Sequence, residues 1–147
     1  MTEELSVYST NLKDNRYLVR CLTVAENTYV NEFVVDTGAK YTCCNCSFVD
    51  RAMNENMLSN CDVKLIGGLV RGEFVKFYKY KLKQFTIGNI DMKEQDIWVT
   101  FDQRVTDAVL GMDILKQIII VTNPYNQMVY FCKDCNDYQD NFELKVS

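Results

Sequence analysis

At 147 residues the chain is long enough for one domain with a buried core and short for two. Apolar residues form 48% of it, which excludes a disordered protein, and no apolar run approaches the roughly 18 residues of a membrane-spanning helix. The formal net charge is −4 and there is no histidine. Ser-His-Asp and Cys-His nucleophiles and all His-ligated metals are therefore excluded, which leaves carboxylates, lysine, tyrosine and thiols for acid-base chemistry.

The cysteines and the N-terminal residues indicate the compartment. There are seven cysteines, an odd number, and Cys43 and Cys44 are adjacent, so reduced thiols are a simpler interpretation than a framework of disulfides. The first ten residues, MTEELSVYST, are acidic and lack the basic start and apolar segment of a secretory signal. We therefore expect a soluble, cytoplasmic, single-domain protein over residues 1–147.

The first predicted elements are two strands and a helix. Residues 17–24 and 28–35 are rich in strand-forming residues, are separated by Ala25-Glu26-Asn27, and predict a hairpin whose second strand ends directly before Asp36. A helix is predicted over about 48–58, because apolar residues recur there at helical spacing behind Ser47 as an N-cap.

A glycine-tipped hairpin is predicted next. The segment VKLIGGLVRGEF, which begins at Val63, places Gly67, Gly68 and Gly72 between strand-forming residues. The second arm is expected to run from Phe74 to about Ile87. Its side chains alternate between an apolar face, formed by Phe74, Tyr78, Tyr80 and Leu82, and a charged face, formed by Lys79, Lys81 and Lys83.

The last third of the chain predicts short strands around one further helix. A turn at Gly88-Asn89 leads to a strand at 97–99, a helical segment is expected around 113–117, and strands follow at 118–121 and 128–131. The total is mostly antiparallel β-structure with one or two helices, which predicts a small β-barrel.

Asp36 begins the tripeptide Asp-Thr-Gly, which allows two interpretations. Asp and Gly are common turn residues, so the tripeptide alone indicates only a turn. However, an apolar strand precedes it, Ala39 and Thr42 follow it, and a second apolar run, Val109-Leu110, stops at Gly111. The glycine-rich hairpin lies between these two segments, although its glycines also suit an ordinary hairpin tip.

In this order the segments resemble those of the retropepsin-like aspartic proteases. The resemblance covers roughly residues 17–131, which implies a core at about 17–131 with extensions at 1–14 and 132–147. Asp36 to Ala39 with Thr42 is similar to the catalytic motif, Lys64 to Leu69 to the flap over the substrate, and Val109 to Asp113 to the signature that braces the catalytic loop. The resemblance implies a mainly β fold, a small closed barrel of the acid protease type with one or two short helices and a β-hairpin flap. It also implies catalytic roles for Asp36, Thr37 and Gly38, and substrate contacts for Ala39, Leu65, Ile66, Gly67, Gly68, Leu69, Val70 and Leu110.

The chain has one Asp-Thr-Gly, whereas aspartic proteases use two carboxylates that share a proton. The resemblance therefore implies a homodimer in which Asp36 meets its symmetry mate on a two-fold axis. In that dimer Thr37 would hydrogen-bond across the axis and the Gly38 amide would donate to the carboxylate. The implied activity is hydrolysis of an extended polypeptide, with no metal or cofactor.

Several alternatives remain open. A catalytically silent domain of this fold would serve as a dimerisation or peptide-binding module. The cysteines at 43, 44, 46, 61, 132 and 135 suit zinc or, for the last two, a redox pair, although reduced cysteine also packs as a small apolar residue. The lysines at 76–83 suit nucleic acid, but the acidic net charge favours a solvent-exposed strand face. Asp113 is interpreted as a helix-start cap.

Overall fold

The computed structural model describes residues 6–9, 16–123, 125 and 128–132. The predicted first hairpin is confirmed: β2 (Leu18–Val24) and β3 (Thr28–Val35) pair antiparallel, with Leu18 opposite Val34. Phe33 on β3 is fully buried, so the hairpin is attached to the core just before the chain reaches Asp36.

Nine strands form one sheet in the order β5-β6-β9-β4-β10-β3-β2-β7-β8. Besides β2 and β3, this sheet contains β4 (Cys43–Asn45), β5 (Val63–Val70), β6 (Glu73–Leu82), β7 (Gln84–Ile87), β8 (Ile90–Asp91), β9 (Gln95–Thr100) and β10 (Val109–Leu110). The mainly β class is therefore confirmed. Closure into a barrel is not seen in the part of the chain that the structure describes, because the end strands β5 and β8 do not pair with each other.

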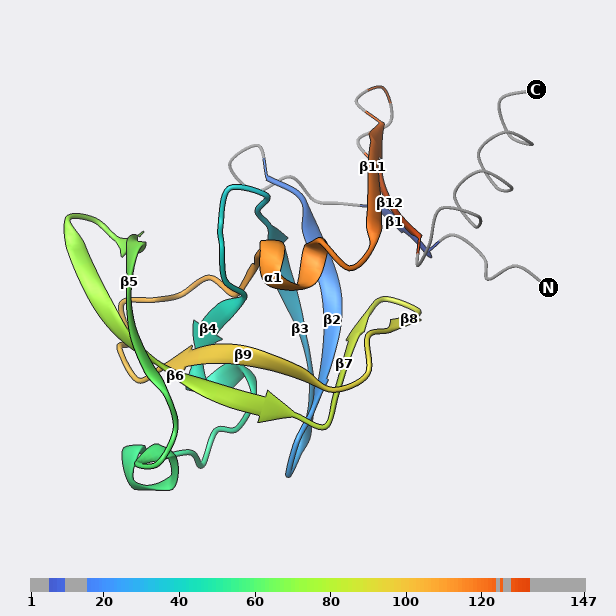
Figure 1. The fold of residues 1–147 in the computed structure, drawn as a ribbon. Helices are drawn as coiled ribbons and strands as arrows, with labels where there is room; N and C mark the ends of the chain where they lie inside the picture. The colour runs from blue at the N-terminus through green and yellow to red at the C-terminus, as the bar shows by residue number, and fades with distance from the viewer. Residues whose placement is uncertain (1–5, 10–15, 124, 126–127, 133–147) are drawn as a thin grey trace.

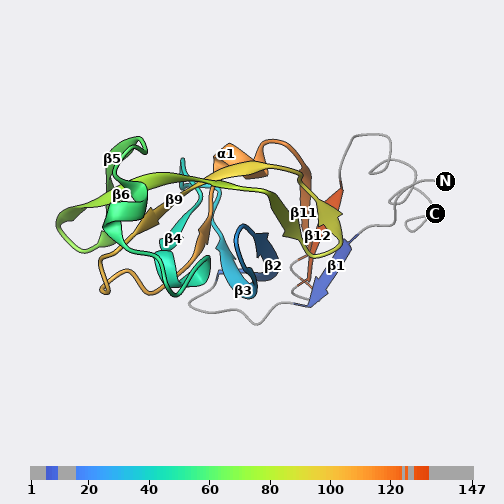
Figure 2. The same ribbon diagram turned by 90° about the horizontal axis from the view of Figure 1, so that it is seen from below.

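A second sheet contains three strands in the order β1-β12-β11, namely β1 (Ser6–Ser9), β11 (Ile119–Asn123) and β12 (Met128–Cys132). It lies at the opposite end of the molecule from the β5–β6 hairpin, as both views show (Figures 1 and 2). The strands at 118–121 and 128–131 were predicted, whereas β1 was not. The N-terminal segment assigned to an extension therefore contributes a strand of the fold.

The predicted helix over 48–58 is wrong. The segment holds two short 3-10 turns, η1 (Cys46–Phe48) and η2 (Glu55–Leu58). Three side-chain oxygens accept hydrogen bonds from nearby backbone amides: Asn45 from Ser47, Asp50 from Ala52 and Asn54 from Met57. Such local bonds compete with the backbone hydrogen bonds of a helix. The apolar residues of this segment therefore pack on the core from turns. The predicted helix near 113–117 is present as α1 (Met112–Leu115).

The predicted second arm at 74–87 also needs correction, because Lys83 divides it into β6 and β7. The turn of the hairpin is at Arg71-Gly72, where Gly72 has φ +75°, and Gly67 and Gly68 lie within β5. Near the tip the alternation is reversed: Phe74 is 75% exposed, while Val75 and Phe77 are buried. The predicted apolar face begins only at Tyr78, where β6 leaves the hairpin and crosses the main core.

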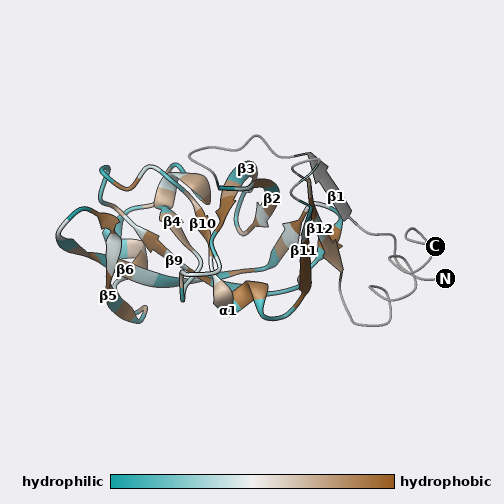
Figure 3. Cartoon of the chain, turned by 90° about the horizontal axis from the view of Figure 1, so that it is seen from above, coloured by the Kyte–Doolittle hydropathy of each residue, from teal (hydrophilic) through white to brown (hydrophobic). Residues whose placement is uncertain are grey.

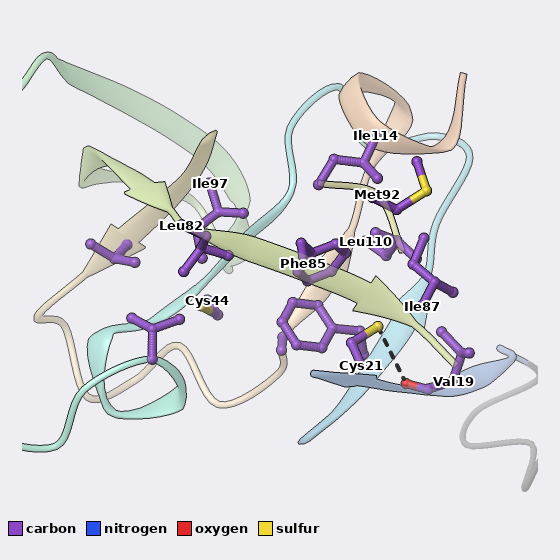
Figure 4. Packing of buried hydrophobic residues seen from close by; sticks show 14 of the residues in the cluster. Val19, Cys21, Cys44, Leu82, Phe85, Ile87, Met92, Ile97, Leu110 and Ile114 are labelled. Carbon is purple, nitrogen blue, oxygen red and sulfur yellow. Dashed lines mark hydrogen bonds between the residues drawn. The ribbon is translucent and has the colours of Figure 1, made fainter. Parts of the chain in front are cut away.

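Apolar side chains form two clusters, which the strands connect. The larger is built around Phe33, Phe85, Leu110 and Ile97, and Figure 4 shows Cys44 and Cys21 packed among its aliphatic side chains. The smaller lies beneath the β5–β6 hairpin and includes Phe77 and Trp98. Figure 3 shows the apolar residues gathered on strands such as β3 and β11. None of the helices in the described residues has the length and apolarity needed to span a bilayer.

Candidate active site

Asp36 is positioned by a parallel strand pair. β3 pairs with β10 so that Val34 lies opposite Val109 and Val35 opposite Leu110. The Asp36 amide, one residue beyond β3, donates to the Leu110 carbonyl at 3.1 Å. This bond fixes the point at which the chain leaves the sheet and sets the half-buried carboxylate at its rim.

The residues after Asp36 form a turn around its carboxylate. The Gly38 amide donates to Asp36 Oδ1 at 2.9 Å, as predicted, and the Ala39 amide donates to the Asp36 carbonyl at 3.1 Å. A Cβ on Gly38 would lie 3.3 Å from Asp36 Oδ1, so glycine leaves room for this close approach. Thr37 is exposed, and no other described residue accepts a hydrogen bond from its hydroxyl.

The far side of this loop is held by the segment that follows β10, so the predicted brace is confirmed. The Met112 amide donates to the Ala39 carbonyl at 2.8 Å and the Asp113 amide to the Lys40 carbonyl at 3.2 Å. A Cβ on Gly111 would lie 2.5 Å from the carbonyl carbon and oxygen of Tyr41, so the loop packs directly on glycine. Only glycine permits this approach.

Thr42 and Asp113 complete the brace. The buried Thr42 hydroxyl donates to Asp113 Oδ1 at 2.7 Å and accepts from the Gly111 amide at 3.0 Å. Asp113 also accepts from the Thr42 amide, at 3.0 and 3.1 Å to its two oxygens, and from the Ile114 amide at 2.8 Å. Asp113 was predicted to cap the start of a helix, but the N-cap of α1 is Gly111 and Asp113 lies in its first turn. The Asp113 carboxylate mainly joins the helix to the loop.

A groove of about 570 Å³ lies between the Asp36 loop and the β5–β6 hairpin. Eight of the predicted site residues line it, namely Asp36, Gly38, Ala39, Leu65, Ile66, Gly67, Gly68 and Leu69. Thr37, Val70 and Leu110 do not. Leu110 is fully buried in this subunit and contributes its carbonyl to the Asp36 amide. A contact between its side chain and a substrate stays a prediction.

The groove has charged lining residues that the sequence did not single out. Arg16 and Asp107 form an ion pair at 3.2 Å, and Lys40 and Tyr41 belong to the same wall. Lys40 and Tyr41 directly follow the predicted motif, so their position along the chain was a usable signal. Arg16 and Asp107 are 91 positions apart, and no sequence pattern indicates their contact.

Two ionisable side chains beside the groove have shifted pKa values. Burial raises the pKa of the Cys43 thiol to about 12, and the negative charges of Asp113 and Asp36 add to this rise. Burial raises the pKa of Tyr41, but the ammonium groups of Lys64 and Lys40 outweigh that effect and hold it below its ordinary value. Cys43 is therefore a neutral wall residue, and a positive potential surrounds Tyr41.

The cysteines behave as small apolar residues. Cys43, Cys44 and Cys46 are all buried as free thiols on or next to β4. Within the described ranges no three His, Cys, Asp or Glu side chains are grouped so as to hold a metal ion. Cys132 is buried in β12, whereas Cys135 and the redox pair proposed for it lie outside the described residues.

The strand-borne Asp-Thr-Gly loop, its brace and the facing hairpin define the class of aspartic proteases. The family model described as "gag-polyprotein putative aspartyl protease" matches residues 22–117. The chain belongs to this family. A search of curated proteins found no significant match.

The fold has counterparts among solved structures. One is a retropepsin-like aspartic protease from Rickettsia conorii, with a TM-score of 0.65 and 17% sequence identity. The alignment covers 89% of this chain and 92% of the Rickettsia chain. The two therefore share a fold over most of both chains.

Proposed function

We propose that this chain is a homodimeric aspartic endopeptidase in which each subunit supplies one Asp36. The observation that carries the proposal is the placement of a single half-buried Asp36 carboxylate in a groove closed on its other side by a β-hairpin. The described groove residues hold no second carboxylate bonded to Asp36, since Asp107 pairs with Arg16. A second copy of the chain supplies the missing group.

In the proposed reaction the two Asp36 carboxyls share one proton, because two adjacent carboxylates do not both ionise. The ionised one removes a proton from a water molecule, whose oxygen attacks the peptide carbonyl carbon. The protonated one donates to the carbonyl oxygen as negative charge develops there, which gives a tetrahedral intermediate. As the C–N bond breaks, the carboxyl that took the water proton passes it to the leaving nitrogen, and the intermediate's hydroxyl returns its proton to the other Asp36. The Gly38 amide, 2.9 Å from Oδ1, supports the ionised carboxylate and fixes its orientation.

The hairpin supports the choice of an extended polypeptide as substrate. β5 is an end strand of the sheet and carries Leu65 to Leu69 along the groove. An extended peptide placed against such an edge forms backbone hydrogen bonds as an added strand, with its alternate side chains in pockets. Thr37, exposed and without an acceptor in the described chain, is available to the partner subunit.

The decisive variant is Asp36→Asn. We expect hydrolysis of unstructured peptides by the wild type, blocked by a statine-type peptide, and complete loss of hydrolysis in the folded variant. Asp62→Asn is the matched control, because its carboxylate is 78% exposed and outside the groove. Circular dichroism and thermal unfolding establish that both variants fold.

Mixing the subunits separates the shared site from a site within one chain. Wild type and Asp36→Asn are mixed in equal amounts and refolded together, so that subunits pair at random. If both carboxylates are needed, the mixture has about one quarter of the activity of wild type at the same total protein concentration. Retention of one half instead would contradict the shared site. Binding of peptides without turnover in the wild-type dimer would favour the second candidate, a catalytically silent peptide-binding module.

A further inference from the structure

Lys40 is a cation in the groove without a neighbouring carboxylate. In the described chain the lysines of the outer sheet face are neutralised: Lys79 lies 3.7 Å from Asp96, Lys81 3.0 Å from Glu94, and Lys83 3.9 Å from Glu26. No described carboxylate oxygen lies within 4.0 Å of Lys40. Lys64 and Lys76 likewise have no described carboxylate within 4.0 Å, but of these three lysines Lys40 is the one that lines the groove with Asp36.

The other charged residues of the groove do not compensate Lys40. Arg16 and Asp107 bond to each other at 3.2 Å. Asp36 accepts from the Gly38 amide and takes part in the proposed reaction. Among the described residues that line the groove, Lys40 is therefore the cation that has no ion-pair partner, and it lies four positions after Asp36 in the chain.

The position of Lys40 is restricted by an aromatic pair. Its Nζ lies 5.4 Å from the centroid of the Tyr41 ring, and Tyr41 packs edge-on against Trp98 with ring centroids 5.8 Å apart. From the hairpin strand β5, Lys64 Nζ lies 5.1 Å from the same Tyr41 ring and 5.4 Å from Trp98. Cation–π attraction and hydrogen bonding to Tyr41 hold both ammonium groups near the rings. An ammonium group has three donors, so Lys40 can still donate to a further acceptor.

Lys64 has a different setting from Lys40. It lines a neighbouring hollow of about 390 Å³ that also contains Lys79, Asp96 and Asp113. Lys64 does not line the groove that contains Asp36, whereas Lys40 does. Tyr41 borders both cavities, so Lys64 supports the ring on which Lys40 rests.

We propose that Lys40 is a specificity-determining residue that binds a carboxylate side chain, Glu or Asp, of the polypeptide substrate near the scissile bond. This inference rests on the proposed function for the identity of the ligand as a peptide. The Lys40 ammonium donates to the substrate carboxylate in a charge-assisted hydrogen bond. Because Lys40 is exposed, salt is expected to weaken this pair.

The test measures binding separately from cleavage. Statine-type peptides of identical sequence, carrying Glu, Gln or Lys at one position at a time around the statine, are titrated into the wild type and followed by fluorescence anisotropy. At one position we expect the Glu peptide to bind about fivefold to tenfold more tightly than the Gln peptide, less so at high salt. In Lys40→Gln this preference disappears, and in Lys40→Glu the Lys peptide binds best.

Lys76→Gln is the matched control. Lys76 also lies above a tyrosine, 5.0 Å from the Tyr78 ring, and has no described carboxylate within 4.0 Å, but it lines a different hollow. Its removal changes the net charge equally and leaves the Glu preference intact. If Lys76→Gln also loses the preference for Glu, the preference comes from the net charge of the protein, and the proposed role of Lys40 is overturned.

The failures of the two proposals are distinguishable. Equal binding of Glu and Gln peptides at every position, with normal cleavage, overturns the role of Lys40 and leaves the protease intact. A Lys40-dependent preference for Glu without cleavage of matched scissile peptides supports the subsite and overturns the enzyme. Absence of binding by every peptide overturns both.

Discussion

The Thr42 hydroxyl donates a 2.7 Å hydrogen bond to the carboxylate of Asp113, a residue 71 positions further along the chain. The bond joins the loop that starts at Asp36 to the first turn of α1. Since the same hydroxyl accepts from the Gly111 amide, one buried oxygen connects the Asp36 loop with two residues of the segment that follows β10.

Removal of this oxygen by Thr42→Val is expected to lower the free energy of unfolding by about 1.5–3 kcal/mol, as for other hydrogen bonds to charged groups. Urea denaturation measures the loss. Thr23→Val is the control, because Thr23 is equally buried but makes a single long bond of 3.5 Å to the Phe48 carbonyl. A smaller loss for Thr42 than for Thr23 would contradict the brace.

Gly111→Ala is expected to lower the free energy of unfolding by about 3 kcal/mol, because its Cβ would overlap the Tyr41 backbone. The measurement is again the urea midpoint. In Gly67→Ala the new Cβ meets the Phe74 ring at 3.0 Å, but that ring is 75% exposed and able to move. A loss below about 1 kcal/mol is therefore expected for this control, and equal losses would refute the steric argument.

The tip of the β5–β6 hairpin is tied to the loop after β9 by Arg104, which contacts Glu73 and lies 2.7 Å from Asp102 Oδ2. Glu73→Gln is expected to speed hydrogen exchange of the amides at 69–74 by about twofold to fivefold at low salt, with the difference shrinking in high salt. Lys81→Gln removes the 3.0 Å pair to Glu94 further along β6 and should leave the tip unchanged. Unaltered tip exchange in Glu73→Gln would disprove the tie.

The contact between Arg104 and Asp102 can be followed through the pKa of Asp102. Hydrogen bonds from the Arg104 side chain and amide lower the pKa of Asp102 from 3.8 to about 2. Because the folded-state pKa is the lower one, the stabilisation is present above pH 3.8 and is lost as the pH falls through about 2. Carboxyl NMR titration should show this midpoint and, in Arg104→Gln, a return toward 3.8.

Sequence patterns predicted the hairpin ending at Asp36 and the brace at 109–113, because local strand propensity and short motifs carry those features. They failed at 48–58, where Asn45, Asp50 and Asn54 bind local amides and override an apolar spacing that suits a helix. They also failed along β6, because the buried face changes where the strand passes from one apolar cluster to the other.

In the candidate site, too, residues of contiguous motifs could be predicted and contacts between distant positions could not. Asp36, Gly38 and the hairpin residues were found because they belong to contiguous motifs. Leu110 was assigned to the substrate because it lies in a motif, and in this subunit its side chain is fully buried while its carbonyl accepts from the Asp36 amide. The pair Arg16 and Asp107 joins positions 91 apart, and only the folded chain brings them together.

The placement of β10 between β3 and β4 also bears on biosynthesis. A growing chain contains Asp36, Thr37 and Gly38 early, but the carbonyl that receives the Asp36 amide and the glycine on which the loop packs are added only at positions 110 and 111. Fragments that stop before this point lack the support for the loop. We therefore expect chains that end before residue 111 to lack the proposed activity.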